Sequence, residues 1–270
     1  MISVLLTIFN KENLIEHVLR SIHKTQSSLV KQWVIVFDGC TDKSEEITRN
    51  YIEGNNVDFQ VDYVHTPDVF EIRANNAGLK IVNQEYVIII QDDMVIYEMN
   101  FDKRLLQPFL KINNLLGVTG RTAHNVEDDG NGGARWTDAI EGPVGHNRGK
   151  PTNVRRDRIY LRLLVNRGPL MLNMEKVRIL NYFSEDYQKN GCDDHDLSIR
   201  GFDKFGWRVG SFWIDYASDL DWGSTRNGPN AEVISKTLLA NEHLLISKHK
   251  MVIENYNYNK EILDQEVIVE

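Results

Sequence analysis

The first half of the chain alternates between short apolar runs and longer amphipathic stretches. The runs Ile2–Ile8, Trp33–Phe37 and Phe59–His65 predict strands. Between them, apolar residues at helical spacing predict helices over Glu12–His23 and Ile72–Val82. Strands that alternate with helices in this way indicate βαβ units and a mostly parallel sheet. The predicted fold class is therefore α/β, with helices flanking a central sheet.

The segment Glu85–Met94 is the most informative part of the pattern. Its continuous run of β-branched residues is typical of a strand that is buried on both faces at the centre of such a sheet. The run ends at two adjacent carboxylates, Asp92 and Asp93. Ligands in open α/β sheets bind beyond the carboxyl ends of the strands, and Mg²⁺ or Mn²⁺ prefers oxygen ligands. The pair predicts a divalent metal site, and a turn that only ends the strand is the alternative.

A further helix is predicted from Asp42, where Glu45 three residues later completes a capping box, and Gly54 is its expected end. Beyond Met94 the pattern is less regular. In chain order it predicts a helix over Leu105–Leu116, a strand over Gly117–Ala123, an ordered segment over Gly168–Asn173, helices over Glu175–Phe183 and Asp193–Phe205, a strand over Trp207–Trp213, and a helix over Ala231–Ile246 followed by a polar tail.

The stretch from 124 to 157 is rich in Gly, Asn, Asp and Arg and lacks periodicity, so it is predicted to be loop. Loops of this length are often functional, and a loop over 124–160 is expected to shape an acceptor site. Between residues 135 and 167 there are eight Lys or Arg against three acids. That balance suits a phosphate-bearing or acidic ligand, and a solvated loop is the alternative.

Composition narrows the function classes. At 270 residues the chain can form one large domain or a domain with an appendage, and its net charge of −8 argues against a general nucleic-acid binder. No stretch approaches the roughly 18 apolar residues of a membrane span. The apolar start has no basic lead, and Cys40 and Cys192 form no framework, so a cytoplasmic location is expected. Cys192 is expected to be a small buried thiol.

Asp38 is a candidate binding residue at the end of the second predicted strand. Gly39 permits a tight turn after it, so the backbone is free to approach a ligand there. A carboxylate at this position can accept a hydrogen bond from the imide N–H of uracil or thymine, or from the corresponding edge of guanine. The alternative is a plain turn residue before the helix that Asp42 caps.

A third acidic cluster opens the helix predicted near residue 193. Asp196 and Arg200 form an i,i+4 pair, which explains one of its acids. The other two, Asp193 and Asp194, are therefore the candidates for a catalytic carboxylate that acts as general base. His195 is interpreted as an exposed helix residue.

Together these motifs resemble those of glycosyltransferase family 2, whose members have the GT-A fold. The resemblance covers roughly residues 1–225, and its motifs follow one another in the family's order. They are Thr7–Glu12, Phe37–Ser44, Arg73–Gly78, Gln91–Asp93 in place of Asp-x-Asp, Cys192–Arg200 in place of Glu-Asp-x-Asp-Leu-x-x-Arg, and Gly206–Val209 in place of the Gly-Tyr-x-Val strand.

The resemblance implies an inverting, metal-dependent glycosyltransferase that uses a nucleoside-diphosphate sugar. Asp93, together with Asp92, would bind Mn²⁺ or Mg²⁺, and Asp194 would deprotonate the acceptor hydroxyl. The donor would be bound by residues of the motifs and of a later segment: Thr7, Phe9, Asn10, Glu12, Asp38, Arg73, Asp92, Gly168 and Pro169.

The sequence departs from the family's pattern at three places. Gln91 stands where the first acid of Asp-x-Asp is usual. Asp193 stands where Glu is usual, so either Asp193 or Asp194 is the expected base. Many relatives place a metal-binding His after the last strand, and Asp221 lies in that region as the candidate third ligand.

The resemblance also implies how the chain is divided. A GT-A domain is expected over 1–225, with a nucleotide-sugar half at 1–98 and an acceptor half at 99–225, and a helical appendage at 226–270. Expected partners are a UDP-, GDP- or dTDP-sugar and a hydroxyl-bearing glycan or glycolipid, either soluble or at a membrane surface.

Two alternative functions are a sugar-nucleotide pyrophosphorylase and a non-catalytic nucleotide-sugar-binding module. A sugar-nucleotide pyrophosphorylase would need a Gly-x-Gly-Thr-Arg loop after the first strand, which the chain lacks there. A non-catalytic nucleotide-sugar-binding module would be favoured by the loss of either acidic motif, and both are present.

Overall fold

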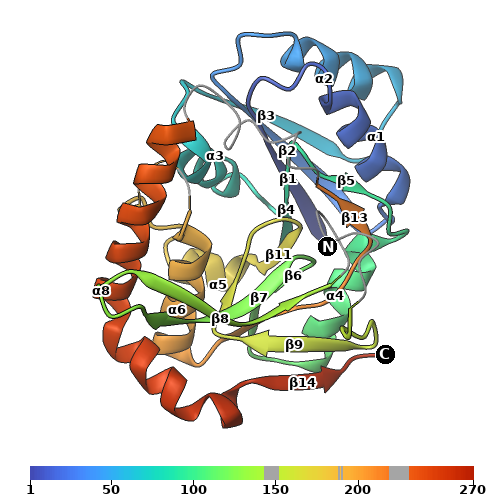
Figure 1. Cartoon of the computed structure of the whole chain (residues 1–270). Helices are drawn as coiled ribbons and strands as arrows, with labels where there is room; N and C mark the ends of the chain where they lie inside the picture. Colours follow the sequence, from blue (N-terminus) through green and yellow to red (C-terminus); the bar gives the residue numbers. More distant parts are fainter. Residues whose placement is uncertain (143–151, 188, 190, 219–230) are drawn as a thin grey trace.

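A nine-stranded sheet crosses the molecule and combines distant parts of the chain (Figure 1). The computed structural model describes residues 1–142, 152–187, 189, 191–218 and 231–270. From one edge to the other, the strands of the sheet are β14 (Gln265–Ile268), β9 (Arg158–Arg162), β12 (Arg208–Ser211), β6 (Leu115–Thr119), β11 (Leu170–Asn173), β4 (Tyr86–Gln91), β1 (Ile2–Ile8), β2 (Val30–Asp38) and β3 (Gln60–Thr66).

β4 lies inside this sheet and is buried on both faces, as its apolar run predicts. Ile88 and Ile90 face one apolar cluster, whereas Val87 and Ile89 face the other, because successive side chains of a strand point to opposite sides. β1 to β4 run parallel, and β11 is antiparallel to its neighbours β4 and β6. The predicted α/β class is confirmed.

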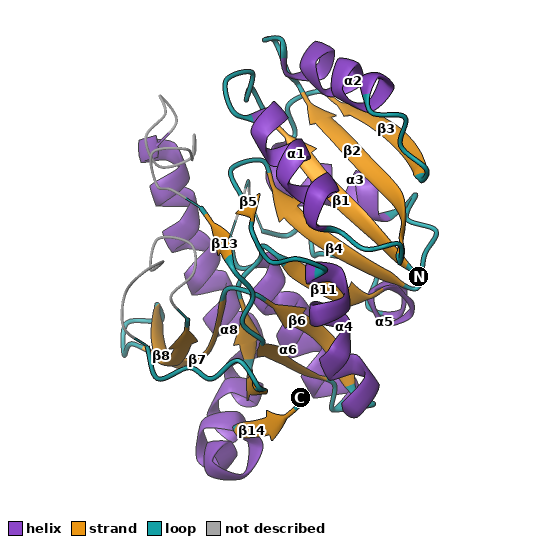
Figure 2. Cartoon of the chain, turned by 90° about the vertical axis from the view of Figure 1, so that its right-hand side faces the viewer, coloured by secondary structure: helices purple, strands orange, loops and turns teal. Residues whose placement is uncertain are grey.

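Helices cover both faces of the sheet (Figure 2). The face of Ile88 is covered by α1 (Ile15–Thr25), α2 (Ser44–Gly54) and α4 (Phe101–Lys111). The opposite face is covered by α3 (Phe70–Leu79), α5 (Met174–Ile179), α6 (Asp193–Phe205) and α8 (Ala231–Leu263).

The helix predicted over Leu105–Leu116 was wrong in its second half. α4 ends at Lys111, and the chain enters β6 at Leu115. Leu115 and Leu116 then face opposite apolar clusters, which is the alternation of a strand. Two adjacent leucines fit a helical and a doubly buried strand pattern equally well, and the sheet decides between them.

The loop predicted over 124–157 was also wrong, because much of it is a β-hairpin. β7 (Thr122–Asp128) pairs antiparallel with β8 (Ala134–Glu141), and β7 also pairs with β10 (Leu164–Val165). Asp128 Oδ1 accepts a hydrogen bond from Gly130 N at 2.8 Å, so carboxylates shape the turn. The strand pattern was hidden because most side chains of β8 are partly or fully exposed.

The polar tail expected after residue 246 was wrong as well. α8 continues to Leu263, with an interruption at His249 (φ −117°, ψ 16°), and β14 then pairs with β9 at the edge of the sheet. Buried apolar residues of this segment, Ile253 and Tyr256, explain why it packs against the domain. No helix in the described ranges has an apolar stretch that could cross a membrane. The domain boundary at 225 lies outside the described residues.

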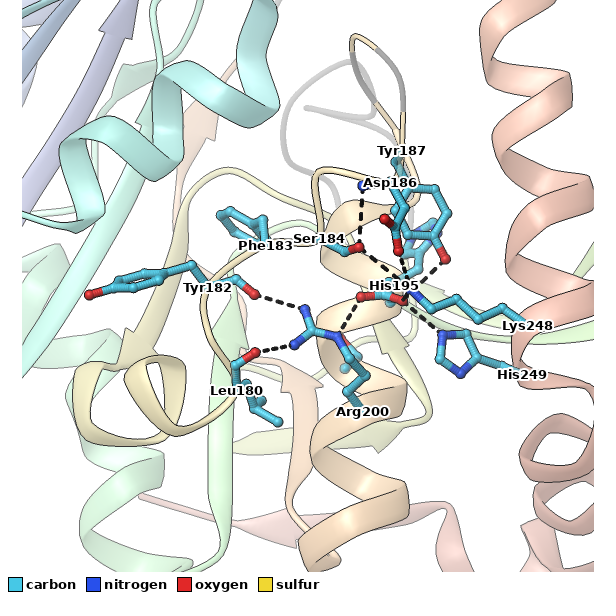
Figure 3. Close-up of polar contacts among 12 residues, drawn as sticks. Leu180, Tyr182, Phe183, Ser184, Asp186, Tyr187, His195, Arg200, Lys248 and His249 are labelled. Atoms are coloured by element: carbon cyan, nitrogen blue, oxygen red, sulfur yellow. Dashed lines mark hydrogen bonds and ion pairs between the residues drawn. The ribbon is translucent and has the colours of Figure 1, made fainter.

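A network around the buried carboxylate of Asp196 joins α8 to α6; its partners Arg200, Lys248 and His249 are labelled in Figure 3. Asp196 Oδ1 lies 2.8 Å from His249 Nε2 and 3.1 Å from Lys248 Nζ, and it accepts a hydrogen bond from Tyr187. Asp196 Oδ2 accepts from Arg200 Nε at 2.5 Å. Burial opposes the charge of Asp196, but His249, Arg200 and Lys248 outweigh it and hold the pKa of Asp196 well below its usual value.

Loss of the Asp196 charge should therefore loosen the contact between α6 and α8. Because its pKa is lower in the folded chain than in the unfolded one, its contribution to stability is present above the ordinary pKa of 3.8 and is lost as the pH falls through the folded pKa. We expect Asp196→Asn to lower the free energy of unfolding by about 3 kcal/mol near neutral pH, with a smaller deficit in acid. Urea unfolding at about pH 7 and about pH 3 measures both.

The matched control is Asp186→Asn, because the exposed carboxylate of Asp186 also binds Lys248, at 3.1 Å. It should change stability far less, since exposed pairs are screened by solvent. Equal losses in the two variants would contradict the role given to Asp196.

Candidate active site

The carboxyl ends of β1, β2 and β4 meet at one edge of the sheet because these strands are parallel. Phe9 follows β1 and Asp92 follows β4, and Phe9 N donates a hydrogen bond to Asp92 Oδ2 at 2.9 Å. Thr7 Oγ1 donates to Asn75 Oδ1 on α3 at 2.8 Å. The edge therefore brings together residues from three of the predicted motifs.

The loops after β1 and β2 are joined by side chains that were predicted to bind the nucleotide. Asn10 Oδ1 accepts a hydrogen bond from Thr41 N at 2.8 Å, and Glu12 Oε2 accepts from Lys43 N at 3.1 Å. In return, Asp42 Oδ2 accepts from Glu12 N at 2.9 Å. Asn10 and Glu12 thus fix the shape of the loops.

The N-cap position of α2 is Lys43, and Asp42 Oδ1 accepts a hydrogen bond from Ser44 N, at the first residue of the helix, at 3.0 Å. The capping box predicted with Glu45 was wrong. Glu45 instead contacts Arg49 and His65, at 2.8 and 2.9 Å. The opposite charge of Arg49 one turn further along the helix competes successfully for this carboxylate.

Asp38 is almost fully buried, with 3% of its surface exposed. Its Oδ1 accepts hydrogen bonds from Thr66 Oγ1 at 2.7 Å and from Val69 N at 2.8 Å. Gly39 has a φ of +62°, and a Cβ there would lie 2.6 Å from the Cβ of Asp68, so a side chain could not be accommodated. These contacts hold the carboxylate at the carboxyl end of β2, among the residues predicted to form the base pocket.

Asp92 and Asp93 lie where β4 ends, as predicted. Burial raises the pKa of Asp92 to about 7. The charge of Lys11, whose Nζ lies 3.9 Å from Asp92 Oδ1, opposes this rise, and the charge of Asp93 adds to it. Burial likewise raises the pKa of Asp93, whose Oδ1 is buried without a hydrogen-bond partner among the described residues. A buried carboxylate oxygen without a donor fits a cation.

The described residues contain no group of three His, Cys, Asp or Glu placed to hold a metal ion by themselves. The predicted third ligand, Asp221, lies outside the described residues. Mg²⁺ and Mn²⁺ are often held by one or two carboxylates and completed by phosphate oxygens of the substrate. Asp92 and Asp93 fit such a site.

The two candidate bases occupy different environments at the start of α6. Asp193 is fully buried and forms a bidentate pair with Arg167, with contacts of 2.5 and 2.9 Å. Asp194, with 6% of its surface exposed, accepts a hydrogen bond through Oδ2 from Arg167 N at 2.7 Å and through Oδ1 from His195 N at 2.9 Å. Burial opposes the charge of Arg167, but the nearby carboxylates outweigh it and raise the pKa of Arg167.

Arg167 and Glu71 are site residues that the sequence analysis missed. Glu71 Oε1 accepts a hydrogen bond from Gln91 Nε2 at 2.9 Å, and its Oε2 lies 3.5 Å from Arg167 Nη2. A chain of polar contacts thus runs from the end of β4 through Glu71 and Arg167 to Asp194. The only sequence signal for Glu71 was its position two residues before the motif at Arg73.

Arg73 and Gly168 differ in how firmly they are placed. Arg73 is largely exposed and lies 3.6 Å from Glu185. Gly168 has a φ of +72°, and a Cβ there would lie 2.6 Å from Met94 Cε, so its backbone approaches the end of β4 closely. The carbonyl of the next residue, Pro169, accepts a hydrogen bond from Gly120 N at 2.8 Å.

Two expectations for the segment around α6 have opposite outcomes. Cys192 is buried, as predicted, and burial raises the pKa of its thiol. The exposed position predicted for His195 was wrong, because the imidazole is buried against His124 of β7, with 3.2 Å between the two Nε2 atoms.

The basic stretch between residues 135 and 167 is largely neutralised within the protein. Arg148 and Lys150 lie outside the described residues. The described arginines of the stretch form ion pairs, which are Arg135–Glu127, Arg155–Asp157, Arg156–Glu98, Arg158–Glu266, Arg162–Asp264 and Arg167–Asp193. Each described arginine of the stretch thus has an acidic partner within the protein.

The sequence model of the family described as "Glycosyl transferase family 2" matches residues 3–174, well over half of the chain. The chain belongs to glycosyl transferase family 2. The predicted family is thereby confirmed, and the matched residues include the motifs from Thr7 to Asp93. No curated protein matches the chain.

Solved structures similar to this family 2 chain share its fold at low sequence identity. The mannosyltransferase PcManGT from Pyrobaculum calidifontis, in complex with GDP-Man and Mn²⁺, is 16% identical, with a TM-score of 0.65 over 95% of this chain and 69% of that chain. GalNAc-T7 with UDP, GalNAc and Mn²⁺ is 13% identical, with a TM-score of 0.71 over 96% and 50%. S. aureus TarS is 17% identical, with a TM-score of 0.56 over 81% and 36%. The chain has the GT-A fold and spans about a third of the TarS chain.

In this family 2 chain, the buried pair of Arg167 and Asp193 should be essential to stability. We expect Arg167→Met to lower the free energy of unfolding by about 3 to 5 kcal/mol, because the carboxylate of Asp193 would remain buried without a partner. Urea unfolding measures this change. Arg73→Met is the control, since it removes an exposed arginine that pairs with Glu185, and it should have little effect. A similarly small effect in both variants would contradict the assignment.

Proposed function

We propose that this family 2 member transfers a sugar from a nucleoside-diphosphate sugar to an acceptor hydroxyl, with inversion at the anomeric carbon and with Mn²⁺ or Mg²⁺. The observation that carries the proposal is the chain of polar contacts from the end of β4 to Asp194. It begins at Gln91, two residues before Asp93, whose buried carboxylate oxygen lacks a hydrogen-bond partner among the described residues, and it ends at a second carboxylate suited to accept a proton. The nucleotides and Mn²⁺ bound to similar structures support a nucleotide sugar and a metal.

Asp93, with Asp92, would hold the metal ion. When bound, the metal would offset the negative charge of the departing nucleoside diphosphate. The base and ribose would lie over the carboxyl ends of β1 and β2, near Thr7, Phe9 and Asp38. Arg73, Gly168 and Pro169 would lie along the donor, which is a UDP-, GDP- or dTDP-sugar.

Asp194 would be the general base. Burial opposes its charge, but His195, Arg167 and two backbone N–H groups outweigh burial and lower the pKa of Asp194, so the carboxylate is ionised at neutral pH. Its oxygen would take the proton of the acceptor hydroxyl as the hydroxyl oxygen attacks the anomeric carbon. The bond from that carbon to the diphosphate breaks on the opposite side, and the diphosphate keeps the electron pair. Asp193 is engaged by Arg167 through both oxygens and is less suited to this role.

The acceptor would be a glycan or glycolipid hydroxyl. It would approach from the side of β7, β8 and α6, because Asp194 lies at the start of α6. A location in the cytoplasm and contact with a membrane surface stay predictions from the sequence.

Nucleotide binding tests the donor and metal sites. We expect one of UDP, GDP and dTDP to bind tightly in calorimetric titration with Mn²⁺ and weakly with EDTA. Asp93→Asn should weaken the metal-dependent binding by more than about tenfold because it removes a metal ligand. Asp203→Asn, at an exposed position on α6, is the control and should bind as the parent does. Absence of binding by all three nucleotides would favour a fold that has lost its donor site.

Turnover tests the base. We expect Asp194→Asn to retain nucleotide binding but to release nucleoside diphosphate from the donor about 10² to 10⁴ times more slowly, because the attacking hydroxyl keeps its proton. The rate is measured with the sugar nucleotide whose nucleotide binds. The Asp203→Asn protein is again the control. A rate in Asp194→Asn close to that of the parent would contradict the assignment of Asp194 as the base.

A further inference from the structure

Three aromatic side chains from different elements meet beside Asp194. His124 lies on β7, Trp136 on β8 and His195 on α6. The ring centroid of Trp136 lies 5.0 Å from that of each imidazole, and His195 Nε2 lies 3.7 Å from Asp194 Oδ1. The indole is therefore one imidazole away from the proposed base.

The two imidazoles form a buried hydrogen-bonded pair. His124 Nδ1 lies 3.3 Å from the carbonyl oxygen of Asn125 and must donate to it. His124 Nε2 then accepts from His195 Nε2, at 3.2 Å. Burial lowers the pKa of His124 to about 3, and burial also lowers the pKa of His195, which the charge of Asp194 opposes.

This arrangement leaves one nitrogen in an unfavourable position. His195 Nδ1 is buried and has no hydrogen-bond partner among the described residues. A pair of apolar side chains would fill the same space without leaving a buried polar atom unsatisfied. Departures of this kind are expected at functional sites, where a side chain must be positioned at the expense of stability.

What the pair supports is the indole of Trp136, 38% of which is exposed. Single exposed apolar side chains are common and need no explanation by themselves. Here, however, the indole is packed edge-to-face on His124 and tilted on His195, so it is held in one orientation, one imidazole away from Asp194. A rigid, partly exposed aromatic ring beside a carboxylate can bind a ligand with an apolar face and a hydroxylated edge.

We propose that Trp136 is a stacking platform for a pyranose ring of the acceptor, held in place by the His124–His195 pair. The inference rests on the proposed function and narrows its acceptor to a carbohydrate. The C–H face of the sugar lies on the indole, and a hydroxyl at the edge of the ring reaches Asp194. A lipid chain suits the site less, because it has no hydroxyl to offer the carboxylate of Asp194.

The test uses sugars alone, so it does not depend on the donor site. Methyl β-D-glucopyranoside, methyl β-D-galactopyranoside and methyl α-D-mannopyranoside are titrated into the protein and followed by NMR, without and with the nucleotide that binds and Mn²⁺. We expect at least one glycoside to shift the indole N–H resonance of Trp136, which is assigned by its absence in Trp136→Phe. Saturation transfer should fall on the C–H protons of one sugar face.

Trp136→Ala should weaken this binding by about tenfold, whereas Trp136→Phe, which keeps an aromatic face, should weaken it less. Tyr258→Ala removes a strongly exposed aromatic ring on α8 and should bind as the parent does. If no glycoside shifts the Trp136 resonance under either condition, or if Trp136→Ala binds as well as the parent, the platform is overturned. If Trp136→Ala does not fold, the resonance shift in the parent and the titration of Trp136→Phe still show whether Trp136 binds the sugar.

The two proposals fail separately. Binding of a glycoside at Trp136 without binding of any nucleotide would contradict the donor site and leave the platform intact. Binding of a nucleotide without any effect of a glycoside on the Trp136 resonance would contradict the platform and leave the donor site intact.

Discussion

The buried guanidinium of Arg167 is the group around which the site is organised. Its side chain forms the bidentate pair with Asp193 and lies near Glu71, while its backbone N–H binds Asp194. Charges removed from water are tolerated only when paired and hydrogen-bonded, so each of these acids requires the arginine and the arginine requires them. Because Glu71 also binds Gln91, the same network fixes the start of α6 relative to the end of β4.

The network also explains how two adjacent aspartates of one motif can have different roles. Asp193 has both oxygens bound to a guanidinium and no exposed surface. Asp194 is bound through backbone N–H groups, which lower its pKa without covering every lone pair. Sequence spacing alone left the choice between the two acids open, since the distinction arises from a residue that is 26 positions away.

Features that depend on neighbouring residues in the sequence could be predicted, whereas features that depend on contacts across the fold could not. The strand before Asp92 was predictable because its apolar run is continuous, and the motifs placed Asp38, Asp93 and Asp194 on the correct elements. Glu71 and Arg167 were missed because their roles depend on contacts made across the fold. The charge of Arg167 in particular was counted as part of a basic loop, whereas in the structure it is paired with a buried acid.

The hairpin of β7 and β8 was missed for a related reason, and so was the segment after residue 246, which forms the second half of α8 and β14. Their exposed polar residues obscure the periodicity of β8, and the segment after residue 246 acquires order by packing on the sheet. Both lie on the side of α6, away from the parallel strands that end at Asp38 and Asp93. The parallel half is therefore specified by local pattern and provides the proposed donor site. The half that would meet the acceptor is specified by tertiary contacts, among which the buried imidazoles beneath Trp136 bear most directly on what that acceptor is.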